Sequence, residues 1–274
     1  MGEAVSSKFN QYVEYTARAP WKLAVKPFRV APDIFFIGNE WVGSYLISTE
    51  EGLIMVDTCL FENLYLTLES IHELGFDPKN IRHILLSHCH ADHVGGAGAI
   101  HELTGAKIWM SRIDAGFKDN PANTEMDDVF YVPPYRVDAF YDDEVPMRFG
   151  SIEIRTCLTP GHTPGTTSFL ISGPDESGKI LTAGMHGGVG PLTMREEYIK
   201  KYGLPENLRQ QFVEGCEELK KINVDITLPS HPAHGELLSK RPSDPDDYHP
   251  FVNKDNWGAF LESRIGFIRE PGRD

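Results

Sequence analysis

Cysteine is scarce and scattered in this chain of 274 residues, and long apolar runs are missing. The four cysteines form no Cys-x-x-Cys pair, which argues against a disulfide framework and for reduced thiols in a cytoplasmic enzyme. They are Cys59, Cys89, Cys157 and Cys216. No stretch approaches the roughly 18 consecutive apolar residues of a transmembrane helix, and residues 1–19 lack the apolar core of a signal peptide. We therefore expect a cytoplasmic protein, or a periplasmic or secreted one if a signal peptide has been removed.

Positive charge is also in short supply. The chain has 26 Lys and Arg residues against 40 Asp and Glu residues, so its formal net charge is −14. Such a surface repels phosphodiester backbones and has no general attraction to anionic lipid. We expect a small-molecule substrate, with no nucleic acid and no membrane as partner. The hydrophobic content of 41% and charged content of 24% are ordinary for a globular protein and exclude disordered and fibrous classes.

Six potential metal ligands are concentrated in three short motifs. Residues 87–93 read Ser-His-Cys-His-Ala-Asp-His, residues 161–165 read Gly-His-Thr-Pro-Gly, and residues 229–232 read Pro-Ser-His-Pro. Imidazole nitrogen and carboxylate oxygen are ligands that Zn²⁺ accepts, and few structural needs would place four of them in six residues. The six candidates are His88, His90, Asp92, His93, His162 and His231.

The spacing of the first motif predicts that it serves two ions. His88 and His90 are two residues apart on an extended chain, so their rings project to the same side, while Cys89 faces away. Asp92 and His93 come where the chain must turn into the next helix. Their side chains can therefore serve a second ion near the first.

The other histidines are weaker candidates for metal ligands. His234 competes with His231, although a position directly after a strand favours His231. His186, in a Gly-Met-His-Gly-Gly turn, either supports a ligand or has no role. A lone histidine is more often a hydrogen-bonded structural residue, and this interpretation applies to the remaining four. They are His72, His83, His101 and His249.

The predicted elements place each ligand motif just past the end of a strand. Apolar runs predict strands at 34–37, 44–47, 53–56, 81–87, 106–110, 152–158, 167–171, 179–183 and 224–228. Helical periodicity predicts helices over 61–74, 95–103 and 205–222. Loops after several strands can converge at one edge of a rigid sheet, which would bring the three motifs together.

We expect residues 1–274 to form a single domain. It would consist of two similar halves, roughly 30–120 and 145–270, because the second half repeats the alternation of strands and helices. Residues 123–145 form an acidic, aromatic insertion between them. This insertion is either a lid over the site or an ordinary surface excursion.

The first motif, continued as Val-Gly-Gly, resembles the signature of the metallo-β-lactamase superfamily, and the resemblance covers nearly the whole chain. It implies an α/β fold of the αββα type, a four-layer sandwich with a dinuclear zinc site between the sheet edges. The turns around His162 and His231 are most similar to subclass B3 β-lactamases. That resemblance implies one ion on His88, His90 and His162. It implies a second ion on Asp92, His93 and His231, with other divalent metals as alternatives to Zn²⁺.

The same resemblance points to residues around the ligands. Asp57, at the end of a strand, matches the family's supporting aspartate. Met185 stands where many B3 enzymes have serine, and we expect it to pack beside the metal, because a thioether is a poor ligand for hydrolytic Zn²⁺. Trp41 and Tyr45 either form an apolar wall for the substrate or belong to the core.

The activity implied is opening of a β-lactam amide by a metal-bound hydroxide, with Asp92 orienting it, and hence antibiotic resistance. Two Zn²⁺ ions can lower the pKa of a shared water to about 7. The alternative is a cytoplasmic lactone, thioester or other amide hydrolase with little lactamase activity. An iron-dependent redox protein and a non-catalytic metal-binding protein are further alternatives. Lactonases, glyoxalase II and persulfide dioxygenases usually have an aspartate after the strand that includes residues 181–185, and this chain has none.

Overall fold

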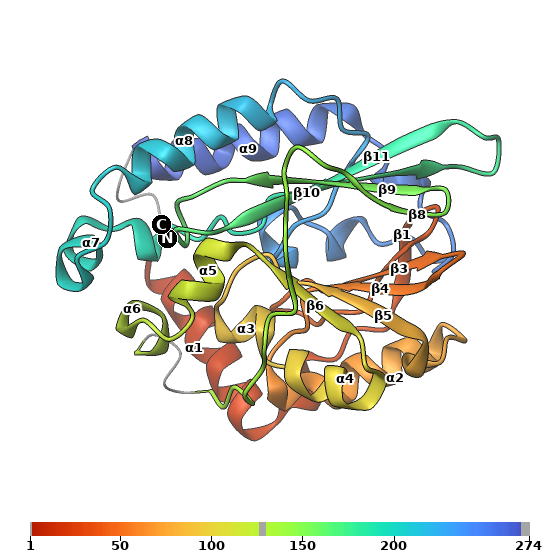
Figure 1. Cartoon of the computed structure of the whole chain (residues 1–274), viewed down its shortest axis with the longest axis horizontal. Helices are drawn as coiled ribbons and strands as arrows, with labels where there is room; N and C mark the ends of the chain where they lie inside the picture. Colours follow the sequence, from red (N-terminus) through yellow and green to blue (C-terminus); the bar gives the residue numbers. More distant parts are fainter. Residues whose placement is uncertain (1, 126–129, 270–274) are drawn as a thin grey trace.

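The structure is a computed structural model that describes residues 2–125 and 130–269, with side chains from residue 8 onward. Two sheets lie face to face at its centre (Figure 1). The first has seven strands in chain order: β1 (Phe28–Ala31), β2 (Ile34–Phe36), β3 (Tyr45–Thr49), β4 (Gly52–Val56), β5 (Ile81–Leu85), β6 (Lys107–Met110) and β7 (Ala139–Phe140). The second has the order β12 (Ile226–Thr227), β11 (Ile180–Met185), β10 (Thr167–Pro174), β9 (Ile152–Leu158) and β8 (Met147–Phe149).

Helices cover the outer face of each sheet. Figure 1 shows α2 (Leu64–Glu73) and α4 (Ala97–Thr104) against the first sheet, and α8 (Leu208–Leu219) and α9 (Lys254–Arg269) against the second. The other helices are α1 (Gly2–Arg18), α3 (Ala91–Val94), α5 (Arg112–Phe117), α6 (Pro121–Thr124) and α7 (Glu196–Tyr202). Short 3₁₀ turns are η1 (Pro20–Leu23), η2 (Phe61–Asn63), η3 (Pro78–Asn80), η4 (Leu192–Met194), η5 (Pro232–His234), η6 (Leu238–Lys240) and η7 (His249–Phe251).

Strand β4 shows why the sheets are apolar on both faces. Ile54 and Val56 point into the core between the two sheets, while Leu53 and Met55 point into the core under α2 and α4. Side chains alternate with a period of two, and both faces of this strand are covered, so every second residue serves a different core. A third core joins the second sheet to α8 and α9. The four layers are thus helices, sheet, sheet and helices, which confirms the predicted αββα fold.

Differences from the predicted elements are concentrated at short or terminal segments. Strand β9 has the predicted bounds, whereas the strand predicted over 224–228 is reduced to two residues that pair in parallel with β11. Segments α1, α7, β1, β7 and β8 were not predicted. The predicted insertion 123–145 contains β7, and its residues 126–129 lie outside the described part of the chain. The division into two similar halves stays a prediction.

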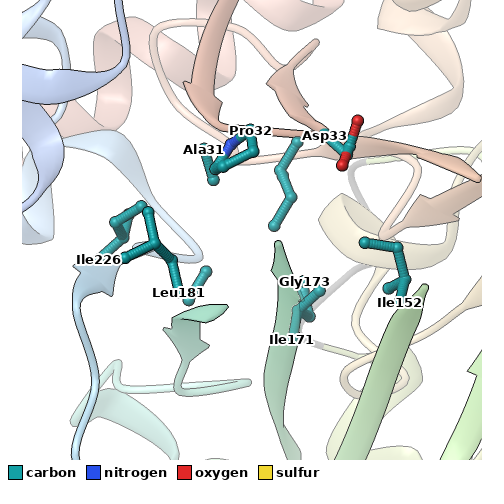
Figure 2. A pocket seen from close by; sticks show the side chains of 10 residues that line it. Ala31, Pro32, Asp33, Ile152, Ile171, Gly173, Leu181 and Ile226 are labelled. Atoms are coloured by element: carbon teal, nitrogen blue, oxygen red, sulfur yellow. The ribbon is translucent and has the colours of Figure 1, made fainter. Parts of the chain in front are cut away.

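A small hollow remains where the two sheets meet. Figure 2 shows it between residues 31–33 of the first sheet and Ile152, Ile171 and Leu181 of the second. Its volume of about 10 Å³ is room for roughly one water. This hollow is a packing gap, too small for a substrate. None of the described helices is long and apolar enough to cross a membrane.

Candidate metal centre

Strands and one short helix carry the three ligand motifs to a common place. The first motif follows β5 and continues into α3, the second follows β9, and the third follows β12. Backbone hydrogen bonds fix the approach of these segments, because Thr167 donates to the Ser87 carbonyl at 2.8 Å and Gly43 donates to the Ser230 carbonyl at 2.7 Å. The loops that carry the three motifs therefore leave the sheets at fixed positions, as we expected for motifs that directly follow strands.

His88, His90 and His162 form the first donor set. Their ring centroids are separated by 4.7, 4.8 and 4.5 Å, and one ligand atom from each lies within 4.8 Å of the others. Nδ1 of His90 faces Nε2 of His162 at 2.9 Å. Nε2 of His88 is buried and has no hydrogen-bond partner among the described residues. A buried nitrogen without a partner is costly, and a bound cation would satisfy it.

Asp92, His93 and His231 form the second donor set. The Nε2 atoms of His93 and His231 are 3.4 Å apart, and Oδ2 of Asp92 lies 3.5 Å from the first and 3.4 Å from the second. Tetrahedral Zn²⁺ with bonds of about 2.0–2.1 Å places its ligands about 3.3–3.4 Å from one another. This triangle therefore already has nearly the size that the ion requires. The two sets adjoin, since the donor atoms of His88, Asp92 and His93 also lie within 4.8 Å of each other.

Asp57 orients one histidine of each set. Its Oδ2 is 2.7 Å from Nδ1 of His93 and accepts a hydrogen bond from the Ser87 hydroxyl at 2.7 Å, and its Oδ1 accepts from the Ser87 amide at 2.8 Å. Because that hydroxyl gives its only proton to Asp57, it accepts from Nδ1 of His88 at 2.9 Å. Both imidazoles thus carry their proton on Nδ1 and present the Nε2 lone pair to a metal.

Backbone carbonyls hold the proton on Nδ1 of two other candidate ligands. Nδ1 of His162 donates to the Gly190 carbonyl at 2.9 Å, and Nδ1 of His231 donates to the Trp41 carbonyl at 2.7 Å. In each case the Nε2 lone pair is directed to the centre. Partners of this kind fix the ring orientation and tautomer of metal-binding histidines.

Burial keeps these imidazoles uncharged. It is the largest cause lowering the pKa of His162 to about 4, and it also lowers the pKa values of His88, His90 and His231, which neighbouring histidines depress further. At neutral pH the lone pairs are therefore available to a cation. The residues fit a divalent metal because imidazoles kept neutral by burial converge with one carboxylate, and the buried Nε2 of His88 has no hydrogen-bond partner among the described residues.

Two glycines pack directly on His162. A Cβ atom added to Gly188 would lie 2.6 Å from Cδ2 of His162, and one added to Gly190 would lie 3.0 Å from Cε1. The loop that follows β11 can approach the ring only because it lacks side chains here.

We expect Gly188→Ala to displace His162 and to weaken divalent metal binding to the first donor set by about 10-fold. The matched control is Gly258→Ala in α9, where an added Cβ meets nothing within 4 Å. The control should leave metal affinity unchanged and stabilise the helix by about 0.5–1 kcal/mol. Competition of each variant with a chelator for zinc checks both results. Equal affinities for Gly188→Ala and Gly258→Ala would show that the ring is not held by this loop.

The residues proposed around the ligands, Tyr45, Trp41 and Met185, are all buried or nearly buried. Tyr45 is fully buried and donates its hydroxyl to the Pro229 carbonyl, which favours the core interpretation over the substrate wall. Trp41 is 9% exposed, stacks on Tyr12 of α1, and reaches the centre through its carbonyl. Met185 is buried in the core between the sheets.

Two histidines outside the donor sets lie near them, and of these His186 is buried and His234 is partly buried. The His186 ring packs on Phe212 with centroids 5.3 Å apart, and its Nδ1 accepts from the Gly188 amide at 3.3 Å. His234 lies beside His231, with ring centroids 5.0 Å apart. The triangle of donor atoms includes His231, so the geometry favours it over His234.

Sequence reasoning missed several parts of the centre. Ser87 and the carbonyl of Gly190 have no signature, because a serine beside a histidine or a carbonyl in a loop is common. The run Gly187-Gly188-Val189-Gly190 was a usable signal, since glycines without turn geometry often mark a close approach. Asp114, a fully buried carboxylate, was also missed.

Comparison with known proteins places this geometry in a family. A family model described as the metallo-beta-lactamase superfamily matches residues 42–231. The structure is similar to the native FEZ-1 metallo-beta-lactamase from Legionella gormanii, with a TM-score of 0.78, 26% identity, and 90% and 95% of the two chains covered. BJP-1, a subclass B3 metallo-beta-lactamase of Bradyrhizobium japonicum, has the same fold at 22% identity, with a TM-score of 0.78 and coverage of 92% and 96%.

Curated relatives have other activities. The N-acyl homoserine lactonase AttM of Agrobacterium fabrum is 28% identical over 134 residues, 42% of this chain and 45% of the relative. The human mitochondrial persulfide dioxygenase ETHE1 is 26% identical over 132 residues, 47% of this chain and 43% of the relative. The chain thus spans about half the length of these curated relatives.

Proposed function

We propose that this chain, which belongs to the metallo-β-lactamase superfamily, is a dinuclear zinc hydrolase that opens β-lactam amides. The observation that carries the proposal is the pair of adjoining donor sets, in which four of the five imidazoles have a defined partner for Nδ1 and an Nε2 directed at the centre. Such a set supports binding of divalent metals with positions left for water and substrate. Superfamily members are mostly hydrolases, which supports an enzyme.

His88, His90 and His162 would hold one ion, and Asp92, His93 and His231 the other. When bound, two such ions supply Lewis acidity for a carbonyl oxygen and lower the pKa of a shared water. Asp57 and the carbonyls of Gly190 and Trp41 keep the ligands in one orientation throughout turnover. We assign Asp92 two roles, with Oδ2 as ligand and Oδ1 as acceptor of a hydrogen bond from the attacking water.

The choice of a β-lactam over other substrates rests on likeness to whole enzymes. The likeness covers 95% of the chain of FEZ-1, which is a metallo-beta-lactamase. In keeping with this, residues 181–190 contain no carboxylate that could bridge two metals. Persulfide dioxygenases usually retain such an aspartate, so the likeness to ETHE1 gives less support to a redox function. We propose zinc as the natural metal on the same basis.

A lactone is the second candidate substrate. The likeness to the lactonase AttM, at 28% identity, favours it, although the aligned region is under half of that protein. A lactone and a β-lactam both present a strained carbonyl whose leaving group becomes an anion, so the same donor sets could serve either. Thioesters and other amides belong to this second candidate.

The two candidates are separated by parallel assays of zinc-loaded protein. One assay follows a chromogenic cephalosporin, and the other follows opening of an N-acyl homoserine lactone; metal-stripped protein is the control. We expect zinc-dependent turnover of the cephalosporin and little of the lactone. Turnover of the lactone alone would replace the β-lactam assignment with a lactonase, and turnover of neither would contradict both.

For His162→Ala we expect loss of the metal at the first donor set and retention of the second. The reason is that this ring supplies one of three donors of the first set and contributes none to the second triangle. His231→Ala is the matched variant and should have the opposite pattern. Metal analysis of both proteins after dialysis checks the partition. An unchanged metal content in His162→Ala would show that the proposed partition is wrong.

A further inference from the structure

One carboxylate outside the donor sets connects the two chain segments that supply the first set. Asp114 lies in α5, directly after β6, and is fully buried. Its Oδ2 accepts hydrogen bonds from the Thr163 hydroxyl at 2.7 Å and the Cys89 amide at 3.1 Å, and its Oδ1 accepts from the Gly165 amide at 2.7 Å. Cys89 stands between His88 and His90 in the sequence, and the other two partners belong to the turn that contains His162.

Burying a carboxylate is costly unless its oxygens are satisfied. Burial raises the pKa of Asp114 to about 6, although hydrogen bonds from Thr163, Gly165 and Cys89 oppose the rise. No Lys or Arg is recorded as an ion-pair partner of Asp114 within the described ranges. The hydrogen bonds that Asp114 accepts instead come from the loops that carry the candidate metal ligands.

The close approach of these loops is built into the sequence. A Cβ atom on Gly165 would lie 2.5 Å from Oδ1 of Asp114 and 2.4 Å from Oγ of Ser111, so only glycine fits. Ser111 in turn accepts from the Asp114 amide at 3.0 Å and caps α5. The cap therefore fixes the position of Asp114 at the start of α5, and from there its carboxylate accepts hydrogen bonds from the loops.

We infer that Asp114 is a positioning residue that sets the distance between the His88–His90 segment and His162, and thereby the metal affinity of the first donor set. This inference rests on the proposed function for the identity of the two sets. Among the described residues, none of the hydrogen bonds that Asp114 accepts comes from Asp92, His93 or His231, whereas Cys89 and the turn of His162 both bond to it directly. Loss of Asp114 should therefore act on one set and spare the other.

The test is cobalt binding to metal-free protein, followed by the visible spectrum and by competition with a chelator. We expect Asp114→Asn to weaken cobalt binding at the first set by about 10–100-fold, while affinity at the second changes by less than about 2-fold. Asparagine keeps the volume but presents an NH₂ group to donors that need an acceptor. The variants His162→Ala and Asp92→Ala supply reference spectra for protein with one set disabled.

Matched variants separate positioning from general support of the fold. Asp138→Asn removes a carboxylate that accepts from the Ile108 amide at 3.0 Å and pairs with Arg136, and should leave both affinities unchanged. Thr163→Val removes a single donor to Asp114 with little change of shape and should weaken the first set by a smaller factor. Thr163→Ser restores the hydroxyl and should restore the affinity. These two variants keep the test decisive if Asp114→Asn does not fold.

Two outcomes distinguish this inference from the proposed function. Equal weakening of both sets, or unchanged affinity in both Asp114→Asn and Thr163→Val, would overturn the positioning role alone. Wild-type protein that binds two cobalt ions but hydrolyses no amide or ester would overturn the proposed function and leave the positioning role intact.

Discussion

Replacing Asp92 with alanine is expected to remove the second metal and to lower turnover by at least about 100-fold, about 2.7 kcal/mol of activation free energy. Asp92 supplies the only carboxylate of the two proposed donor sets, and its Oδ2 lies 3.5 Å from Nε2 of His93 and 3.4 Å from Nε2 of His231. Without it the second ion keeps two neutral ligands, and the attacking water loses its proposed acceptor.

The fold should survive this change. The Asp92 side chain is 17% exposed and lies at the end of the sheets, outside the apolar cores. Unfolding of metal-free Asp92→Ala should therefore resemble that of metal-free wild type. His234→Ala is the matched control, because it removes a histidine beside His231 that lies outside both sets, and it should keep two equivalents of zinc. Two equivalents bound to Asp92→Ala would refute the assignment of Asp92 as a ligand.

Replacing Asp57 with alanine should have the largest effect on stability. The change leaves the Ser87 amide, the Ser87 hydroxyl and Nδ1 of His93 buried without their acceptor. Each such loss costs about 1–3 kcal/mol, so we expect at least about 3 kcal/mol. Asp57 also has a φ of 54°, a region that aspartate tolerates better than alanine.

Chemical denaturation of metal-free protein measures this cost without the contribution of bound zinc. Asp57→Asn keeps the volume and part of the acceptor, so it should unfold more like wild type while its zinc affinity falls by about 10–100-fold. Asp119→Ala, whose carboxylate is 83% exposed, is the surface control and should change stability by less than about 0.5 kcal/mol. A stability loss for Asp57→Ala no larger than that of Asp119→Ala would contradict the central role given to this carboxylate.

The layered fold and the meeting place of the motifs could be predicted because their signals are local. His88 and His90 share a side of an extended segment, and His162 and His231 each follow an apolar run, so the sheet edges bring them together. Short strands such as β7, with two residues, have too little pattern to be recognised. They exist because a neighbouring strand supplies their hydrogen bonds.

The supporting contacts were less predictable because they depend on tertiary packing. A backbone carbonyl has the same chemistry at every residue, so nothing marked those of Trp41 and Gly190 as partners of His231 and His162. Asp114 is a single aspartate in a short helix, and only the fold reveals that its hydrogen-bond donors come from the loops with the candidate ligands. Whether Tyr45 faced substrate or core depended on the second sheet, which covers it.

The most direct test is a titration of zinc into metal-free protein while hydrolysis of a chromogenic cephalosporin is followed. The two donor sets predict that bound zinc reaches two equivalents, and that hydrolysis rises with it and then stays constant. Hydrolysis that is absent at two bound equivalents would contradict the β-lactamase assignment. Hydrolysis that proceeds equally in metal-free protein, or a chain that binds no zinc, would contradict a metal-dependent hydrolase altogether.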